Sequence, residues 1–329
     1  MKIIDNYESS SIEVIENKDQ KIIVSPKLEK DGYSNYYNFI VSNLLDKDGI
    51  LIIRNLNKMK YIPNEYNLLY RDKDGNYKKI DKSRIKKNRD DIEIKILKNE
   101  ELEISSYPRY TYSDLEIYLK DNNIEYEDIN GLKKIVIGDT SKNIIFILGR
   151  QHPGETLSSF FIEGILNYLK NNEIEDYCFM IYPIVSVYGV KNGCHRYTLD
   201  YDYNRMWNTS GIISEIDYLK SELDKYNISL FIDVHGDEVD SFDYIRTRKN
   251  LGNSFAGIQV LKDRSKMMRI ARELIKQGKF PDFSKQTSRE YVTSKYKCDN
   301  ILIELSLSNT TSDEAREKGG EFIKKLIKR

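Results

Sequence analysis

Cysteine and histidine are both scarce in this chain of 329 residues, which contains three of each. The cysteines Cys178, Cys194 and Cys298 are odd in number and widely spaced. A disulfide framework is therefore not expected, and neither is a thiolate zinc site with C-x-x-C spacing. A reducing, cytoplasmic environment is the simplest expectation from this usage. A metal site that needs imidazole has to draw on the three histidines.

Long apolar runs and an excess of charge of one sign are also lacking. The first residues contain no apolar core of the secretory type, and the longest apolar run, near 144–148, is far too short to span a membrane. Basic and acidic residues balance at 52 each, so no electrostatic attraction to nucleic acid or to an anionic membrane is expected. The composition is typical of a globular protein.

Short runs that alternate between apolar and polar residues dominate the first third of the chain. Examples are KIIVSP at 21–26 and DIEIKILK at 91–98, which have the length and the two-residue period of strands. Turn signals such as Asp48-Gly49 separate these runs. We predict a small antiparallel β-sandwich domain over residues 1–110.

Strands alternate with helices over the remaining residues, 111–329. NIIFILG, SLFIDVHG and NILIELSL are typical of buried strands, whereas 156–170, 214–226 and 264–278 have the apolar period of helices. Ser113 is a candidate N-cap for an earlier helix. This order predicts an α/β domain whose mixed, mostly parallel sheet is flanked by helices, with functional groups at the strand ends.

Two histidine motifs stand at the ends of predicted strands. In GRQHPGETLSS, His152 and Glu155 flank a Pro-Gly turn that allows both side chains to point at one position. In SLFIDVHGDE, His235 ends an apolar run. Two imidazoles and one carboxylate are suited to zinc and leave a coordination position for water. Taken singly, the first motif has a surface loop as its alternative, and His235 has a core histidine as its alternative. His195 is expected to be an ordinary polar residue.

Two polar clusters accompany the histidine motifs. Glu304 interrupts the apolar strand NILIELSL, either as a salt-bridge partner or as a general base in a partly desolvated cleft. The stretch NGCHRYTLDYDYNRMW carries Arg196, Asp202, Asn204 and Arg205. Guanidinium groups beside an amide are suited to binding a carboxylate or stabilising an oxyanion. A solvated polar loop is the alternative for this stretch.

These clusters, in this order, resemble the zinc metallocarboxypeptidases, and more closely their cytosolic carboxypeptidase subfamily, whose members include enzymes that trim glutamates from tubulin tails. GRQHPGETLSS at 149–159 resembles the subfamily's A-R-x-H-P-G-E-T-x-S-S. The stretch at 184–207 resembles N-P-D-G-V-x-x-G-x-x-R-x-x-L-x-x-x-D-L-N-R-x-W, and DVHGD at 233–237 resembles D-F-H-G-H. YYNFIVSN at 36–43 and YPRYTYSDLEIYL at 107–119 resemble segments of its β-rich domain and of the junction that follows. The resemblance thus extends over nearly the whole chain.

The resemblance implies a catalytic domain over residues 111–329 that binds one zinc ion through three ligands: His152, Glu155 and His235. Glu304 would be the general base, Arg196 would stabilise the oxyanion, and Asp202 would orient a zinc-binding histidine. The expected substrate is the C-terminal tail of a peptide or protein.

Further residues would bind that substrate. Asn204 and Arg205 would hold its terminal carboxylate. Arg289 would favour an acidic terminal residue, glutamate or aspartate, with a surface arginine as the alternative. Tyr291 and Tyr296 are both candidates for a phenol that covers the substrate.

The sequence also departs from the subfamily pattern. The subfamily's Ser/Cys-Tyr-Thr-x-Glu is here NILIE at 300–304, which lacks the hydroxyl groups, and N-P-D-G is replaced by SVYG. These changes leave the polarity of the substrate pocket open. Two alternatives to the carboxypeptidase remain: a zinc amidohydrolase acting on N-acyl amino acids or cell-wall peptides, and a non-catalytic module that binds acidic tails.

Overall fold

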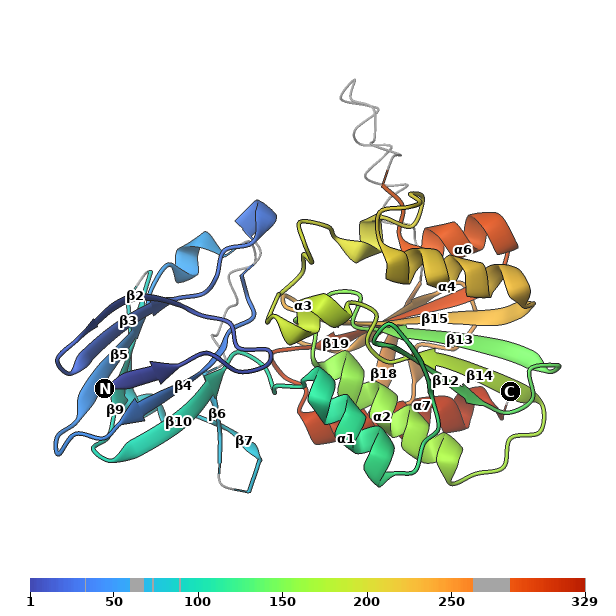
Figure 1. The fold of residues 1–329 in the computed structure, drawn as a ribbon. Coiled ribbons are helices and arrows are strands. Elements are labelled where there is room, and N and C mark those ends of the chain that lie inside the picture. Colours follow the sequence, from blue (N-terminus) through green and yellow to red (C-terminus); the bar gives the residue numbers. More distant parts are fainter. Residues whose placement is uncertain (33, 60–67, 73, 89, 263–284, 329) are drawn as a thin grey trace.

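The structure is a computed structural model that describes every residue of the chain except 33, 60–67, 73, 89, 263–284 and 329. Two small β-sheets form one side of the molecule and an α/β unit forms the other (Figure 1). The helix predicted at 264–278 lies outside the described residues. Within the described residues, no helix is both long and apolar enough to cross a membrane.

The N-terminal part consists of two five-stranded sheets. The first is antiparallel, in the order β1 (Lys2–Ile4), β4 (Asn38–Asn43), β10 (Glu100–Ser105), β6 (Leu69–Arg71) and β7 (Tyr77–Lys79). The second has the order β2 (Glu13–Lys18), β3 (Lys21–Ser25), β5 (Gly49–Ile53), β9 (Ile92–Ile96) and β8 (Ile85–Lys87). Its strands are antiparallel except for the β3–β5 pair.

One hydrophobic core joins the two small sheets. Phe39 and Ile104 from the first sheet and Leu51 and Ile94 from the second are all fully buried members of it. The two-residue period of the sequence explains this arrangement, because it places every second side chain of a strand on the inner face.

The α/β unit is built on a nine-stranded mixed sheet. In order across the sheet, its strands are β11 (Glu127–Ile129), β12 (Leu132–Ile137), β14 (Tyr177–Tyr182), β13 (Asn143–Gly149), β15 (Ile228–Asp237), β19 (Asp299–Ser306), β16 (Tyr244–Thr247), β18 (Ile258–Lys262) and β17 (Ser254–Phe255). The four central strands β14, β13, β15 and β19 run parallel. The predicted fold class is therefore confirmed.

Helices cover both faces of this sheet (Figure 1). The described helices are α1 (Tyr112–Asp121), α2 (Leu157–Lys170), α3 (Val187–Lys191), α4 (Ser214–Lys225), α6 (Ser288–Tyr296) and α7 (Ser312–Leu326). Helices α1, α2 and α7 share one core with Ile232 and Ile303 of the sheet, and α4 and α6 share another with Phe231. Because side chains alternate along a strand, Asp233, His235 and Glu304 project towards the α4–α6 face.

The predicted N-cap of α1 was wrong by two residues. Thr111 Oγ1 accepts a hydrogen bond from the Asp114 amide (2.9 Å), and the Asp114 carboxylate accepts one from the Thr111 amide (2.7 Å). This reciprocal pair is a capping box. The backbone amide of Ser113 instead donates to Glu8.

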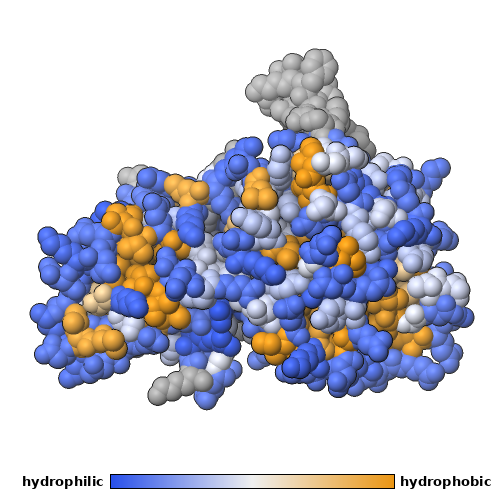
Figure 2. Space-filling model, in the orientation of Figure 1, coloured by the Kyte–Doolittle hydropathy of each residue, from blue (hydrophilic) through white to orange (hydrophobic). Residues whose placement is uncertain are grey.

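The outer surface agrees with the balanced, highly charged composition. Figure 2 shows a mainly hydrophilic face on which apolar side chains gather in several places, including the N-terminal strands. The most exposed of the large apolar side chains among the described residues is Leu44, at 82%. Isolated apolar residues of this kind are ordinary on protein surfaces.

Candidate metal centre

The loop between β13 and α2 is held by a buried arginine. Arg150 is 1% exposed and has a left-handed backbone conformation with φ 52°. Its guanidinium donates to the Pro153 carbonyl (2.8 Å from Nε) and to Ser159 Oγ (3.1 Å from Nη1). Burial lowers the pKa of Arg150 to about 10, which leaves the group charged at neutral pH. These bonds fix the turn that carries His152 and Glu155.

Gly154 allows a second loop to approach this turn closely. A Cβ atom on Gly154 would lie 2.7 Å from His195 Cδ2 and 2.9 Å from the His195 backbone. The Gly154 amide also donates to the His195 carbonyl at 2.6 Å. Glycine at this position therefore has a physical basis in the close approach of His195 to the turn.

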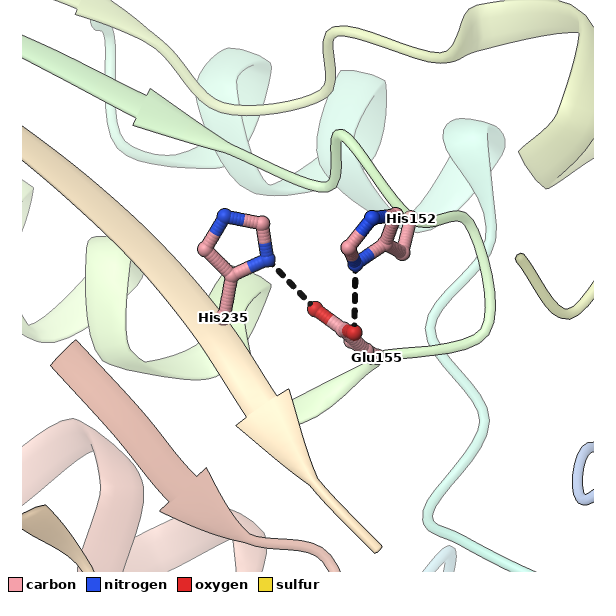
Figure 3. Close-up of side chains that lie close together, drawn as sticks. All are labelled: His152, Glu155 and His235. Atoms are coloured by element: carbon pink, nitrogen blue, oxygen red, sulfur yellow. Dashed lines mark hydrogen bonds and ion pairs between the residues drawn. The ribbon is translucent and has the colours of Figure 1, made fainter. Parts of the chain in front are cut away.

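The three predicted ligands converge at one point. Ligand atoms of His152, Glu155 and His235 all lie within 4.8 Å of one another, and each residue is at most 4% exposed. Glu155 Oε1 lies 2.6 Å from His152 Nδ1, and Glu155 Oε2 lies 2.8 Å from His235 Nδ1 (Figure 3). Both Nδ1 atoms thus face the same carboxylate, one from the loop and the other from the end of β15.

A carboxylate stands behind each histidine. His152 Nε2 lies 3.1 Å from Asp202 Oδ1, and His235 Nε2 lies 3.0 Å from Asp233 Oδ2. Metal-binding histidines commonly donate their second ring N–H to a carboxylate, which fixes the tautomer and directs the other nitrogen to the metal. The cluster therefore fits a metal ion held by two Nδ1 atoms and Glu155, a donor set typical of catalytic zinc.

The electrostatics of the cluster also favour a cation. Burial opposes ionisation of Glu155, but His152 and His235 offset this effect and hold the pKa of its carboxyl well below the usual range. Burial lowers the pKa of His235, yet Asp233 and Glu155 raise it more, so that the pKa lies well above the usual range. Several buried carboxylates thus act together on one small volume, and a divalent ion would balance their charge.

Asp233 is a site residue that the sequence analysis missed. It is fully buried and accepts hydrogen bonds from Gln151 Nε2 (2.8 Å to Oδ1) and Ser288 Oγ (2.5 Å). These contacts hold the carboxylate behind His235. The sequence signal for Asp233 is the D-x-H spacing within a single strand. Residues two apart project from the same face, so Asp233 lies next to His235.

Glu304 lies beside the cluster. It pairs in register with His235 across the parallel strands β15 and β19, so both side chains project from the same face of the sheet. Although part of the Glu304 residue is exposed, its carboxyl group is shielded from water, and this burial raises the pKa of the carboxyl well above its usual range. Glu155 raises the pKa further, while His235 lowers it. A metal dication at the cluster would act in the same sense as His235.

The four polar residues of the predicted binding stretch gather near the histidines. Arg196 Nε donates to Asp202 Oδ2 at 2.8 Å, which links Arg196 to His152 through the same carboxylate. Asn204 Nδ2 lies 3.1 Å from His235 Nε2. Arg205 Nη1 donates to the Asn204 carbonyl at 2.7 Å. Asn204 and Arg205 belong to a short 3-10 turn, η4 (Tyr203–Arg205).

Arg289 lies near the start of α6, on the side of the sheet towards which His235 and Glu304 project. Its Nε donates to Asn300 Oδ1 (2.7 Å) and its Nη2 donates to the Arg246 carbonyl (3.3 Å). Arg246 is a second cation in this region that the sequence analysis missed. It lies on β16, two residues after Tyr244, the residue that pairs in register with Glu304. Strand pairing alone brings Arg246 here, and no local motif signals it.

The two tyrosines proposed to cover the substrate, and the third histidine, contact residues outside the cluster of three ligands. The Tyr296 phenol donates to Asp224 of α4 at 2.6 Å, and the Tyr291 phenol accepts from Lys295 at 3.1 Å. His195 Nε2 lies 2.8 Å from Glu238 Oε1, and the metal-ligand cluster found among the described residues does not include it.

The fold has clear counterparts among solved structures, although no family model matches the sequence. A metallo-carboxypeptidase from Burkholderia cenocepacia has a TM-score of 0.80 at 13% identity and covers 99% of this chain and 98% of its own. A metallo-carboxypeptidase from Pseudomonas aeruginosa, in complex with (2-guanidinoethylmercapto)succinic acid, has a TM-score of 0.78 at 17% identity, with 99% and 98% covered. The fold is therefore that of the metallocarboxypeptidases.

The proteins that this chain resembles in sequence include cytosolic carboxypeptidases. Cytosolic carboxypeptidase 6 of Caenorhabditis elegans is 34% identical over 116 residues, which are 33% of this chain and 25% of that protein. Cytosolic carboxypeptidase 1 of Mus musculus is 42% identical over 72 residues, or 20% of this chain and 6% of that protein. The chain thus matches a quarter or less of the length of these relatives. The chain is therefore similar to the metallocarboxypeptidases in fold and, over part of its sequence, to the cytosolic carboxypeptidases, which confirms the predicted resemblance.

Proposed function

We propose that the protein is a zinc-dependent carboxypeptidase that removes C-terminal residues from peptides or protein tails. One observation carries the proposal: a buried His-Glu-His cluster, each histidine backed by a carboxylate, lies beside a glutamate in register with one of the ligands. A structural metal site has no need of that glutamate or of the arginines nearby. The names of the relatives also support this activity and a cytoplasmic setting.

Each residue near the cluster has a chemical task in this proposal. Bound zinc would supply Lewis acidity, which activates water and polarises the scissile carbonyl. Glu304 would accept a proton from the attacking water and deliver it to the leaving amine. Arg196, held by Asp202, would stabilise negative charge as it develops on the carbonyl oxygen.

The substrate's terminal carboxylate would be bound by the η4 turn. Arg205 would supply the positive charge and Asn204 a hydrogen bond. Asn204 also accepts a hydrogen bond from the Ser288 amide at 2.9 Å, so the turn is tied to the start of α6. This contact would keep the carboxylate site at a fixed distance from the metal, which selects for residues at a chain end.

The proposal is tested by digesting a mixed peptide library with zinc-loaded protein and identifying the products by mass spectrometry. We expect loss of single C-terminal residues, abolished by a chelator and restored by added zinc. Products released from internal positions, or no trimming by protein that has bound zinc, would contradict the proposal. The amidohydrolase would then be tested on N-acyl amino acids, and the tail-binding module by titration with acidic peptides.

A preference for acidic terminal residues forms the finer part of the proposal. Arg289 and Arg246 place two cations on the side of the sheet where Glu304 projects. Replacing Arg289 with alanine is expected to lower kcat/KM for a peptide ending in glutamate by about tenfold more than for the same peptide ending in leucine. The measurement is the ratio of the two kcat/KM values. Arg54→Ala, in the N-terminal part, serves as the control, and equal losses on both peptides would assign Arg289 a structural role.

A further inference from the structure

Glu29, a carboxylate of the N-terminal part, contacts the segment that carries Arg196. Glu29 lies between β3 and the 3-10 turn η1 (Lys30–Gly32). It accepts hydrogen bonds from three consecutive backbone amides of the α/β unit: those of His195, Arg196 (2.8 Å) and Tyr197 (2.9 Å). The first bond goes to one carboxylate oxygen and the other two go to its partner oxygen.

These three amides belong to a segment that lacks regular secondary structure. Residues 195–197 lie between α3 and η4 and form neither helix nor strand. Backbone donors in such a segment need partners, since leaving a half-buried amide unsatisfied is costly. A run of successive N–H groups forms a concave site for an anion, and bonds to an ionised carboxylate are stronger than neutral ones. Glu29 is therefore well suited to fix this segment.

The same segment contacts the metal centre from its other side. The Arg196 side chain is bonded to Asp202, which lies against His152. The His195 carbonyl accepts from the Gly154 amide in the turn between His152 and Glu155. Residues 195–197 are thus held between Glu29 and the candidate active site, and a shift of their backbone would move Arg196.

We propose that Glu29 is a positioning residue through which the N-terminal part sets the location of Arg196. This inference rests on the proposed function, in which Arg196 stabilises the oxyanion. It gives the β-sandwich a direct task in catalysis, because the anion that orders the active-site loop comes from that domain. Loss of Glu29 should weaken catalysis while leaving the metal ligands and their own partners intact.

Glu8 provides a matched control. It also lies in the N-terminal part, and its two carboxylate oxygens accept from backbone amides of the α/β unit, those of Tyr112 and Ser113, both at 3.2 Å. Its partners begin α1, whereas those of Glu29 carry Arg196. Glu29→Gln and Glu8→Gln each keep the size of the side chain and replace one accepting oxygen with a donating NH₂ group.

The test measures peptide trimming and hydrogen exchange on the full-length, zinc-loaded chain. Glu29→Gln is expected to lower kcat/KM by about 10- to 100-fold, mainly through kcat, with unchanged zinc content. Amides of 195–197 should exchange at least about tenfold faster, because the carboxylate that protects them is altered. Glu8→Gln should change neither quantity by more than about twofold. Unchanged kcat/KM and exchange in Glu29→Gln would overturn the inference.

A double-mutant cycle separates positioning from a general structural effect. In the Arg196→Ala background, Glu29→Gln is expected to lower kcat/KM by less than about twofold, since the group it positions is gone. An equal loss in both backgrounds would overturn the inference. If the wild-type protein trims no peptide, the proposed function fails, and the exchange comparison of Glu29→Gln with Glu8→Gln still decides whether Glu29 orders the loop.

Discussion

Replacing Glu304 with glutamine is expected to lower kcat by about 10²- to 10⁴-fold while zinc stays bound at about one ion per chain. Glutamine preserves the size of the side chain and some of its hydrogen bonding, but it cannot accept and pass on a proton. Glu304 is not among the three clustered ligands, so the metal site should keep its composition.

The measurements are single-turnover rates on a peptide substrate and zinc content by elemental analysis. Glu321→Gln is the control, because Glu321 lies on α7 and pairs with Lys324 on the protein surface. Turnover that persists at the wild-type level in Glu304→Gln would exclude Glu304 as the general base. Loss of zinc together with turnover would instead assign Glu304 to metal binding.

Replacing His235 with alanine is expected to abolish stable zinc binding and, with it, all trimming. Two ligands would remain, and the buried carboxylates of Glu155 and Asp233 would lose the imidazole that lies between them. Unpaired buried charge is costly, so the free energy of unfolding should also fall, by roughly 3–5 kcal/mol. Zinc content after dialysis and urea unfolding measure the two effects.

Asp233→Asn provides a graded comparison for this variant. It retains all three ligands and changes only the carboxylate behind His235, so zinc affinity should fall by about 10- to 100-fold. Competition with a chromophoric chelator measures this affinity. A His235→Ala protein that still holds about one zinc ion per chain would show that the metal binds elsewhere.

The clustering of the proposed metal ligands could be predicted because their signals are local. His152 and Glu155 lie three residues apart across a turn, and His235 ends a strand whose apolar run is plain in the sequence. Strands alternating with helices then bring both segments to neighbouring strand ends, because β13 and β15 pair in parallel. The fold class follows from the same periodicity.

The supporting residues could not be predicted in this way. Glu29 and Arg196 are 167 residues apart, and nothing near Glu29 in the sequence points to a loop of the other domain. Arg246 approaches Arg289 only because β16 pairs with β19. These contacts depend on tertiary structure, which a local pattern does not contain. The cap of α1 is different: Thr111 and Asp114 have the local T-x-x-D spacing of a capping box, so the assignment to Ser113 overlooked a signal that the sequence contains.

The register of β15 against β19 has a consequence for which parts of this protein can change. His235 and Glu304 are held opposite each other by an uninterrupted run of eight paired residues, so the main chain itself sets the spacing between the proposed metal ligand and the proposed proton acceptor. A slip of one residue would turn Glu304 to the opposite face of the sheet. Loops do not set this particular distance, although the loop after β13 carries His152 and Glu155, and Arg196 lies in an irregular segment. Loops that carry none of these residues can therefore change in length or charge while the spacing of His235 and Glu304 is kept.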